Sequence, residues 1–330
     1  MVTMTVNEDS EAESAETVVI TLGSPTNAVT GSVTERTITI VEENVAPMIH
    51  LSVAQGGTSG RIVAADGGPV TVTANYSDLN PGDTHTLEWD SALSGLDYVT
   101  IDGATVTVDP SLLGDTLMTA SATVTDDGNP ILSASDSVVV KILATAPALG
   151  ADDSDGDGIS DADEGYGDSD NDGIPDYLDN IDESNLAPVG DSGDVVQTSA
   201  GTTVVLGDTA FSSGNNEVGI DESDVGSADA DWDYLGGLVD FKVSGGQAGA
   251  TYNVVIPLSG TVPAGAVLRK FMGDNIGWQD FVENATNAIH SAMATSGTCP
   301  EPGSSAYAPG LPTADGMSEQ TICLELLIED

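Results

Sequence analysis

The sequence predicts a mostly β protein, in which tandem β-sandwich modules are joined by one irregular segment. Short runs rich in Val, Ile and Thr recur along the chain between Gly, Pro, Asn and Asp, which is the pattern of strands and turns. Their regular spacing favours antiparallel sandwiches over parallel α/β units. Residues 152–183 lack such runs and are strongly acidic. The clearest predicted strands are residues 17–22, 37–41, 70–76, 84–89, 104–108, 137–143, 202–206, 251–256 and 321–328.

The charge balance excludes several classes of partner. The 330 residues include 54 Asp and Glu against 6 Lys and Arg, a formal net charge of −48 at pH 7. Such a surface repels nucleic-acid phosphates and anionic lipid headgroups. With 39% hydrophobic residues the chain can still bury cores, so it is not a disordered acidic tail. The sequence contains no run of about 18 apolar residues, so it predicts no transmembrane helix.

The same balance predicts an extracellular or cell-surface location, because so large a charge is tolerated where divalent cations or salt are abundant. Residues 1–11 have neither the basic nor the apolar region of a secretion signal. The chain opens on one strand-like segment and stops within another. We therefore interpret it as an internal piece of a longer exported protein, with signal peptide and anchor outside it. A complete cytoplasmic protein is the alternative.

Three Ala-Pro junctions, at residues 46–47, 146–147 and 187–188, divide the chain. Proline holds the preceding residue extended and cannot continue a strand ladder, so these junctions suit hinges between domains. The predicted modules are residues 1–45, 46–146, 147–186 and 187–330. Residues 280–293 depart from the β pattern, because Phe281, Ala288 and Ala292 fall on one helical face and predict a helix there.

The first module has acidic residues before the strand at 17–22, a turn at 23–27, and a strand at 37–41 that closes on an acidic end. These features resemble the second half of a Calx-beta domain, a family that binds calcium through acidic loop residues. The resemblance implies Glu8, Asp9, Glu42 and Glu43 as candidate ligands of an incomplete site. Solvated loop acids are the alternative.

In the second module, residues 122–130 (ATVTDDGNP) resemble the last hairpin of cadherin repeats. The module as a whole resembles an immunoglobulin-like sandwich of the cadherin or polycystic-kidney-disease-repeat type. Trp89 is predicted to lie in its core, and Asp78, Asn80 and Asp83 predict a polar turn, with a metal role as the alternative. The linker at 141–145 lacks the acids of a full cadherin calcium site, so we expect a spacer or a displayed binding face.

Residues 152–183 hold fourteen carboxylates and neither Lys nor Arg, arranged as two copies of one pattern 15 residues apart. Calcium loops need oxygen ligands at positions 1, 3, 5, 9 and 12, a backbone carbonyl at position 7, and Gly at position 6 for a sharp turn. The first copy supplies Asp153, Asp155, Asp157, Ile159, Asp161 and Glu164; the second supplies Asp168, Asp170, Asp172, Ile174, Asp176 and Asp179. Asp179 is shorter than the usual Glu, which predicts weaker bidentate contact.

Electrostatics predicts Ca²⁺ as the cofactor of these loops. Two carboxylates about 5 Å apart repel by roughly 3 kcal/mol at an effective dielectric constant of about 20, and each loop would gather five. A bound cation turns this repulsion into ligation and folding energy. Mg²⁺ resists dehydration, and Zn²⁺ would lack its preferred His or Cys. A solvated acidic linker is the alternative, but composition alone does not readily place Gly and Ile in register in both copies.

Residues 165–167 alone separate the loops, so no exiting helix of the EF-hand or dockerin kind fits between them. The sequences DSDGDGISDADE and DSDNDGIPDYLD resemble thrombospondin type 3 repeats. In that family the chain winds around a row of calcium ions and has little hydrophobic core. Asp182 and Glu183 either begin a degenerate third unit or cap the segment.

The last module carries recognisable sequence features at residues 239–243, 251–257, 269–271, 277–281 and 299–330. At these residues it resembles the choice-of-anchor U domain of bacterial surface proteins, and the resemblance implies a cellular location more than a chemical activity. Cys299 and Cys323 are the only cysteines, and such a pair in an exported chain predicts a disulfide. Two buried thiols are the alternative.

No catalytic pattern stands out, because His50, His85 and His290 share no motif and no nucleophile or phosphate-binding signature occurs. The sequence therefore predicts a calcium-binding, non-enzymatic segment of an exported cell-surface protein, acting as a calcium-stiffened stalk or adhesion module. Its expected partners are calcium ions and a ligand on a host or neighbouring cell surface. The alternatives are an accessory region of a secreted hydrolase, whose catalytic domain lies outside this sequence, and a mineral- or ice-surface binder.

Overall fold

The computed structural model confirms the mostly β fold class. It describes residues 16–21, 23, 26, 34–40, 44–80, 82–190, 193–226, 229, 232–234, 237–246, 250–258, 262–263, 265–271, 277–284, 286–311 and 321–329. Within these ranges, α-helix is confined to two short pieces, α1 (Asp161–Glu164) and α2 (Asp208–Ser213). The remaining regular structure is strand, with short 3₁₀ turns at Ser91–Leu93, Pro110–Leu112 and Asp176–Leu178.

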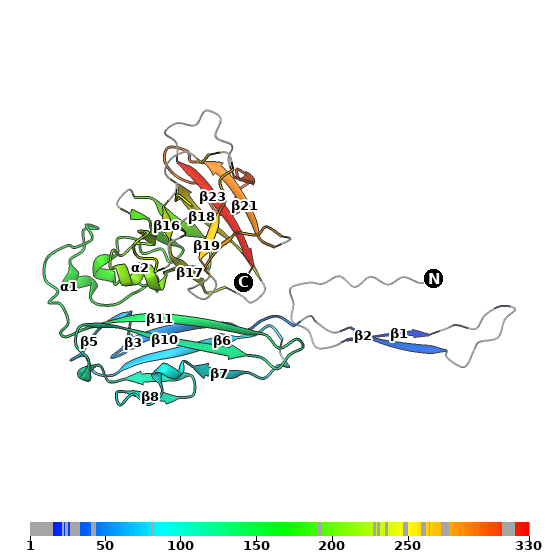
Figure 1. Ribbon diagram of the computed structural model, residues 1–330, viewed down its shortest axis with the longest axis horizontal. Coiled ribbons are helices and arrows are strands. Elements are labelled where there is room, and N and C mark those ends of the chain that lie inside the picture. The colour runs from blue at the N-terminus through cyan, green and yellow to red at the C-terminus, as the bar shows by residue number, and fades with distance from the viewer. Residues whose placement is uncertain are drawn as a thin grey trace.

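The first two strands, β1 (Glu16–Thr21) and β2 (Glu35–Ile40), form an antiparallel ribbon that pairs Val18 with Ile38. The ribbon extends away from the other β structure in Figure 1. Both strands were predicted from their Val, Ile and Thr content. The candidate ligands Glu8, Asp9, Glu42 and Glu43 lie outside the described residues.

Two sheets then pack face to face as a β-sandwich, with strand orders β4-β3-β6-β9-β8 and β5-β11-β10-β7. Alternation along the strands builds its core, because Val70, Val72 and Ala74 of one strand all point inward. Trp89 is half-buried at the edge of this core, and its Nε1 donates to the Gly103 carbonyl at 3.0 Å. One pairing, β5 with β11, is parallel. The strands are β3 (Met48–Gln55), β4 (Thr58–Ser59), β5 (Ile62–Ala64), β6 (Val70–Ser77), β7 (Thr86–Trp89), β8 (Val99–Asp102), β9 (Thr105–Val108), β10 (Thr116–Thr125) and β11 (Ser133–Leu143).

The C-terminal β domain is built on a six-stranded sheet of order β12-β13-β18-β23-β21-β22, with the two-stranded pairs β14-β17, β15-β16 and β19-β20 beside it. Its central strand, β23, pairs with both β18 and β21. The strands are β12 (Leu186–Pro188), β13 (Val195–Thr198), β14 (Thr203–Leu206), β15 (Gly219–Ile220), β16 (Leu238–Val239), β17 (Phe241–Ser244), β18 (Thr251–Leu258), β19 (Arg269–Phe271), β20 (Trp278–Asp280), β21 (Ala288–Met293), β22 (Ala308–Pro309) and β23 (Ile322–Glu329).

The predicted helix at residues 280–293 is wrong, because strand β21 occupies residues 288–293. Oδ1 of Asn284 accepts hydrogen bonds from the backbone amides of Thr286 and Asn287, at 2.9 and 2.8 Å. Such local bonds from an Asn side chain compete with a helix and form a turn instead. Beyond the turn, Ile289 lies opposite Leu326 of β23 and is buried there, whereas Ala288 and Ala292 are only partly buried in the same strand.

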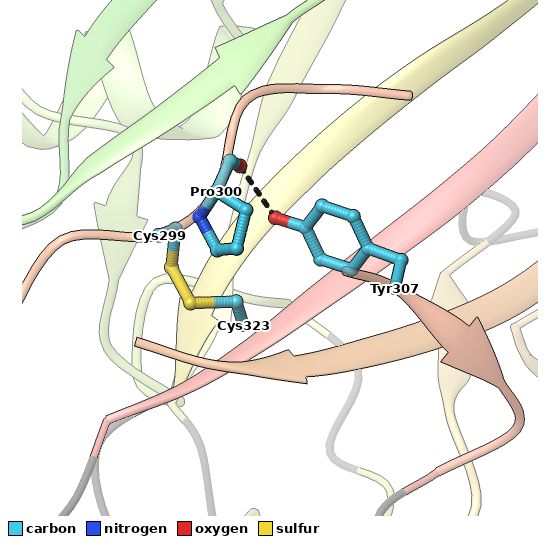
Figure 2. The surroundings of a disulfide bond; sticks show 4 residues. All are labelled: Cys299, Pro300, Tyr307 and Cys323. Atoms are coloured by element: carbon cyan, nitrogen blue, oxygen red, sulfur yellow. Dashed lines mark hydrogen bonds between the residues drawn. A yellow bond between two sulfur atoms is a disulfide. The ribbon is translucent and has the colours of Figure 1, made fainter. Parts of the chain in front are cut away.

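Cys299 and Cys323 form the predicted disulfide, shown in Figure 2. Cys323 lies on β23 and is fully buried beside Val255. Tyr307 packs in the same small cluster as Cys323 and Val255, and its hydroxyl donates to the Pro300 carbonyl at 2.7 Å. The bridge thus ties the loop at 299 to the central strand of the sheet.

The core of the C-terminal domain continues onto the surface of the sandwich. The buried cluster that contains Leu206 and Phe211 also includes Val139 of β11, and Ile62 of β5 packs against it. Helix α2 accordingly lies beside β11 in Figure 1. Ile174, from the acidic segment, is buried in the same cluster. The second half of the acidic segment, around Ile174, therefore lies where the two β domains meet.

Candidate metal centre

The two acidic loops adopt the same local conformation. In each, the carboxylates at positions 1, 3 and 5 bring one oxygen apiece within 4.8 Å of one another: Asp153, Asp155 and Asp157 in the first loop, and Asp168, Asp170 and Asp172 in the second. Position 6 has a φ of 99° in both copies, at Gly158 and Gly173. That left-handed backbone favours Gly, which explains the residue at this position of the pattern.

Backbone hydrogen bonds aim these carboxylates in the same way in both loops. Oδ1 of Asp157 accepts from the amide of Ile159, and Oδ1 of Asp172 accepts from the amide of Ile174, each at 2.7 Å. The residues at positions 1 and 3 accept equivalent bonds from amides inside their own loops. In the second loop one oxygen of each of these acids shapes the loop, and the other has no hydrogen-bond partner in the described residues. In the first loop Asp155 follows this pattern, whereas both oxygens of Asp153 accept backbone bonds, from Gly156 and Gly158.

The acids at position 9 are held differently. Both oxygens of Asp161 accept hydrogen bonds from Ser154, through its amide and its hydroxyl, each at 2.9 Å. Asp176 is held in the same way by Ser169, at 2.7 and 2.9 Å. In this structure these two aspartates brace the loops, and neither belongs to the three-carboxylate groups. Sequence reasoning missed the brace, although Ser stands at position 2 of both copies.

Several carboxylate oxygens are buried without a hydrogen-bond partner in the described structure. They are Oδ2 of Asp155 and Oε2 of Glu164 in the first loop, and Oδ1 of Asp168, Oδ2 of Asp170 and Oδ2 of Asp172 in the second. Buried polar atoms are normally paired, and an unpaired carboxylate oxygen is among the costliest exceptions. A cation coordinated by these oxygens would satisfy them.

The second loop is much more buried than the first. Asp168 is 5% exposed and Asp172 is fully buried, whereas Asp153 and Asp157 are exposed. Burial, followed by the charge of Asp170, raises the pKa of Asp168 to about 7 and that of Asp172 to about 9. Burial likewise raises the pKa of Asp179, at position 12, to about 7. A cation would favour the ionised carboxylates and reverse these shifts.

Both β domains touch the second loop. The hydroxyl of Ser59, in the sandwich, donates to the carbonyl of Asp168 at 3.0 Å. The amide of Leu206, in the C-terminal domain, donates to the carbonyl of Asp172 at 2.7 Å. Gly173 lies against Arg61, since a β-carbon there would be 3.4 Å from Nη1 of that arginine. Sequence reasoning did not single out Arg61, although it is one of only 6 basic residues.

A third group of acids lies at one end of the sandwich, where Asp78, Asp83 and Asp126 bring carboxylate oxygens within 4.8 Å of one another. Oδ1 of Asp78 accepts from the amide of Asn80 at 2.8 Å, and this is the bond of the predicted polar turn. The segment before β3 is held from both sides: Oδ1 of Asn80, in the turn, accepts from the amide of Val45 at 2.8 Å, and Oδ2 of Asp126, just after β10, accepts from Asn44 at 2.9 Å. Oδ2 of Asp83 is buried without a hydrogen-bond partner in the described residues.

The three histidines lie apart, and each faces one acid. His85 is 2.8 Å from Asp78, and His290 is 3.2 Å from Glu325. His50 is 3.8 Å from Asp136, at the boundary between the β domains. In the described residues, none of the three histidines is hydrogen-bonded to a Ser hydroxyl or a Cys thiol, so they assemble no catalytic triad.

No family model matches the chain, and no curated protein matches it. Among solved structures, PcdhgB3 EC1-4 is similar at 18% identity and a TM-score of 0.20, over 34% of this chain and 29% of that one. The protocadherin GammaB4 extracellular domain is similar at 12% identity and a TM-score of 0.23, over 97% of this chain and 56% of that one. Similarities this weak support no conclusion about function. In the described residues, no helix has the length and apolar character that crossing a bilayer requires.

Proposed function

We propose that this chain is a calcium-binding, non-enzymatic segment of an exported cell-surface protein, and that each of its two acidic loops binds one calcium ion. The observation that carries the proposal is the pair of buried, unpaired oxygens on Asp168 and Asp172 in the second loop. Without a cation, those carboxylates would have to be protonated or the loop would have to open.

The donor set favours calcium over other ions. At positions 1, 3, 5, 9 and 12 every side-chain ligand offered is a carboxylate oxygen, and the backbone carbonyls of Ile159 and Ile174 stand at position 7 of the pattern. Ca²⁺ accepts six to eight oxygens in flexible geometry, whereas Mg²⁺ demands a strict octahedron and keeps its water. In the proposed sites, positions 1, 3, 5 and 12 supply side chains directly. Asp161 and Asp176 stay on their serines or reach the ion through water.

A structural role outside the cell agrees with the rest of the molecule. The Cys299–Cys323 disulfide is of a kind that persists in oxidising, extracellular settings. The acidic segment joins two β domains, which suits a connector that calcium stiffens. We propose a stalk or adhesion module whose flanking domains present the surface for a ligand on another cell.

Calorimetric titration of the whole chain with calcium, and separately with magnesium, tests the proposal. The whole chain is needed because Ile174 is buried among residues of both β domains. We expect two saturable calcium sites with Kd values on the order of 10⁻⁵–10⁻³ M, and weaker binding of magnesium. The matched variants Asp157→Asn and Asp172→Asn change the same loop position, so each should remove or weaken one site. No saturable binding, or equal binding of both ions, would refute calcium binding by these loops.

A further inference from the structure

We infer that the second loop is a calcium-dependent latch, in which the ion bound there, and not the ion in the first loop, docks the C-terminal β domain onto the β-sandwich. This inference rests on the calcium binding proposed above. The two loops have nearly the same sequence but different surroundings, so the sequence repeat alone does not distinguish them.

The isoleucines at position 7 show the difference most directly. Ile159 is 48% exposed, whereas Ile174 is 1% exposed and packs in the cluster that contains Val139, Leu206 and Phe211. Val139 belongs to the sandwich, and the other two belong to the C-terminal domain. Ile174 therefore fills the boundary between the domains, while its counterpart in the first loop faces solvent.

Two ligand residues of one site are each bonded to a different domain. The carbonyl of Asp168 accepts from Ser59 of the sandwich, and the carbonyl of Asp172 accepts from Leu206 of the C-terminal domain. An ion that holds the carboxylates of Asp168 and Asp172 together therefore also holds these two attachment points together. The hydrogen bonds of the first loop, by contrast, stay within residues 150–165 of the described structure.

Arg61 spans the boundary next to the latch. Its guanidinium donates to the carbonyl of Val139 at 3.0 Å, to the carbonyl of Leu206 at 2.8 Å and to Oδ1 of Asp208 at 2.9 Å. It also lies 4.0 Å from the ring centre of Phe211. All these partners except Val139 belong to the C-terminal domain, so undocking would leave this buried arginine without most of its bonds.

Calcium shifts the docking equilibrium because it binds the two states unequally. In the docked state Asp168 and Asp172 are buried, with the half-buried Asp170 beside them, and carboxylates this close and this far from water repel strongly. Opening the loop relieves that repulsion when no ion is present. With the ion in place, the same cluster is the ligand shell, and closing the loop also buries Ile174. Docking and ion affinity must therefore strengthen each other by the same factor.

The test compares Ile174→Ser with Ile159→Ser in the whole chain, since both replace position 7 and keep its backbone carbonyl. Donor and acceptor dyes on Leu112→Cys and Val282→Cys, both exposed and one in each domain, report docking by energy transfer. The native disulfide stays intact because labelling is done without reductant. Calorimetry on the same samples counts bound calcium ions.

We expect calcium to change the energy transfer of the parent protein and of Ile159→Ser alike. Ile174→Ser should still bind two ions, with about tenfold weaker affinity at one site, and should lose most of the energy-transfer change. Two bound ions with no change in energy transfer in the parent would overturn the latch and leave calcium binding intact. No bound ion would overturn both.

A second pair of variants guards against misfolding of Ile174→Ser. Asp172→Asn is nearly isosteric and should lose one ion together with the calcium-dependent energy transfer. Asp157→Asn should also lose one ion, but it should keep the calcium-dependent change in energy transfer. If Asp157→Asn abolishes the energy-transfer change as completely as Asp172→Asn does, the latch is not specific to the second loop and the inference is wrong.

Discussion

Arg61 donates a 2.9 Å hydrogen bond to Oδ1 of Asp208, a residue 147 positions later in the chain. Arg61 lies in the β-sandwich and is only 7% exposed, and Asp208 begins α2 of the C-terminal domain. Lys242 completes the group, with Nζ 3.1 Å from Asp136 and 3.3 Å from Asp208. In a chain with 6 basic residues, two of them neutralise acids at this one boundary.

Replacing Arg61 should destabilise the docked form. Arg61→Ala leaves Asp208 and two buried carbonyls short of a donor, and breaking a buried ion pair costs about 3–5 kcal/mol. Arg61→Lys should recover only part of the lost stability. It keeps the positive charge, but an ammonium group lacks the planar set of donors that bonds all three acceptors at once. Urea unfolding measures both. The control is Arg36→Ala on the exposed face of β2, where a change within about 0.5 kcal/mol is expected; an equal loss at both positions would contradict the role of Arg61.

In the absence of calcium, the free energy of unfolding should decrease as pH rises. Burial raises the pKa of Asp168 and Asp179 to about 7 and that of Asp172 to about 9, from a usual value near 3.8. Between about pH 4 and these values the folded chain holds more protons than the unfolded one, so the free energy of unfolding decreases with increasing pH. With chelator present, the Tm should be lower at pH 8 than at pH 5.

Saturating calcium should reverse that trend, because protons then compete with the ion for the same oxygens. The Tm at pH 8 should equal or exceed the Tm at pH 5, measured by calorimetry in the same buffers. A chelated sample whose Tm rises from pH 5 to pH 8 would show that these acids are not buried together without the ion.

Removing the disulfide should weaken the C-terminal domain. Closing a loop between cysteines 24 positions apart stabilises by roughly 3–4 kcal/mol in the chain-entropy picture, so Cys299→Ser with Cys323→Ser should lower the free energy of unfolding by about that amount. Unfolding can be followed by the fluorescence of Trp232 and Trp278, with Trp89→Phe as background to silence the sandwich. An unfolding curve that reductant leaves unchanged would show that the bridge contributes nothing.

The serine braces should tune calcium affinity without supplying ligands. Ser154→Ala and Ser169→Ala each remove a 2.9 Å hydrogen bond to the acid at position 9. Losing one such bond costs about 1 kcal/mol, which is a several-fold weaker Kd at the loop concerned. Ser160→Ala is the control, because the hydroxyl of Ser160 bonds Asp163 outside the ligand pattern. Calorimetry should separate the three variants, and a brace variant that binds like Ser160→Ala would contradict this role.

Strand prediction succeeded where side-chain alternation and β-branched content agree, as in residues 70–76, which lie in β6 (Val70–Ser77). It failed at residues 280–293, where apolar spacing mimics a helix while Asn284 makes a turn and β23 supplies a partner strand. Local spacing cannot reveal a pairing partner more than thirty residues away. The same limit applies to Arg61, whose partners at Leu206 and Asp208 become neighbours only through the fold.

The sequence by itself determined the conformation of the acidic loops. Their shaping bonds join residues two to seven positions apart, so the repeated pattern produces the same geometry twice. Only the tertiary structure decided that the copies differ, with Ile159 48% exposed and Ile174 1% exposed. The physical reason is that a residue's burial depends on which distant segments pack around it, and here Val139 and Leu206 close over the second loop and leave the first in water.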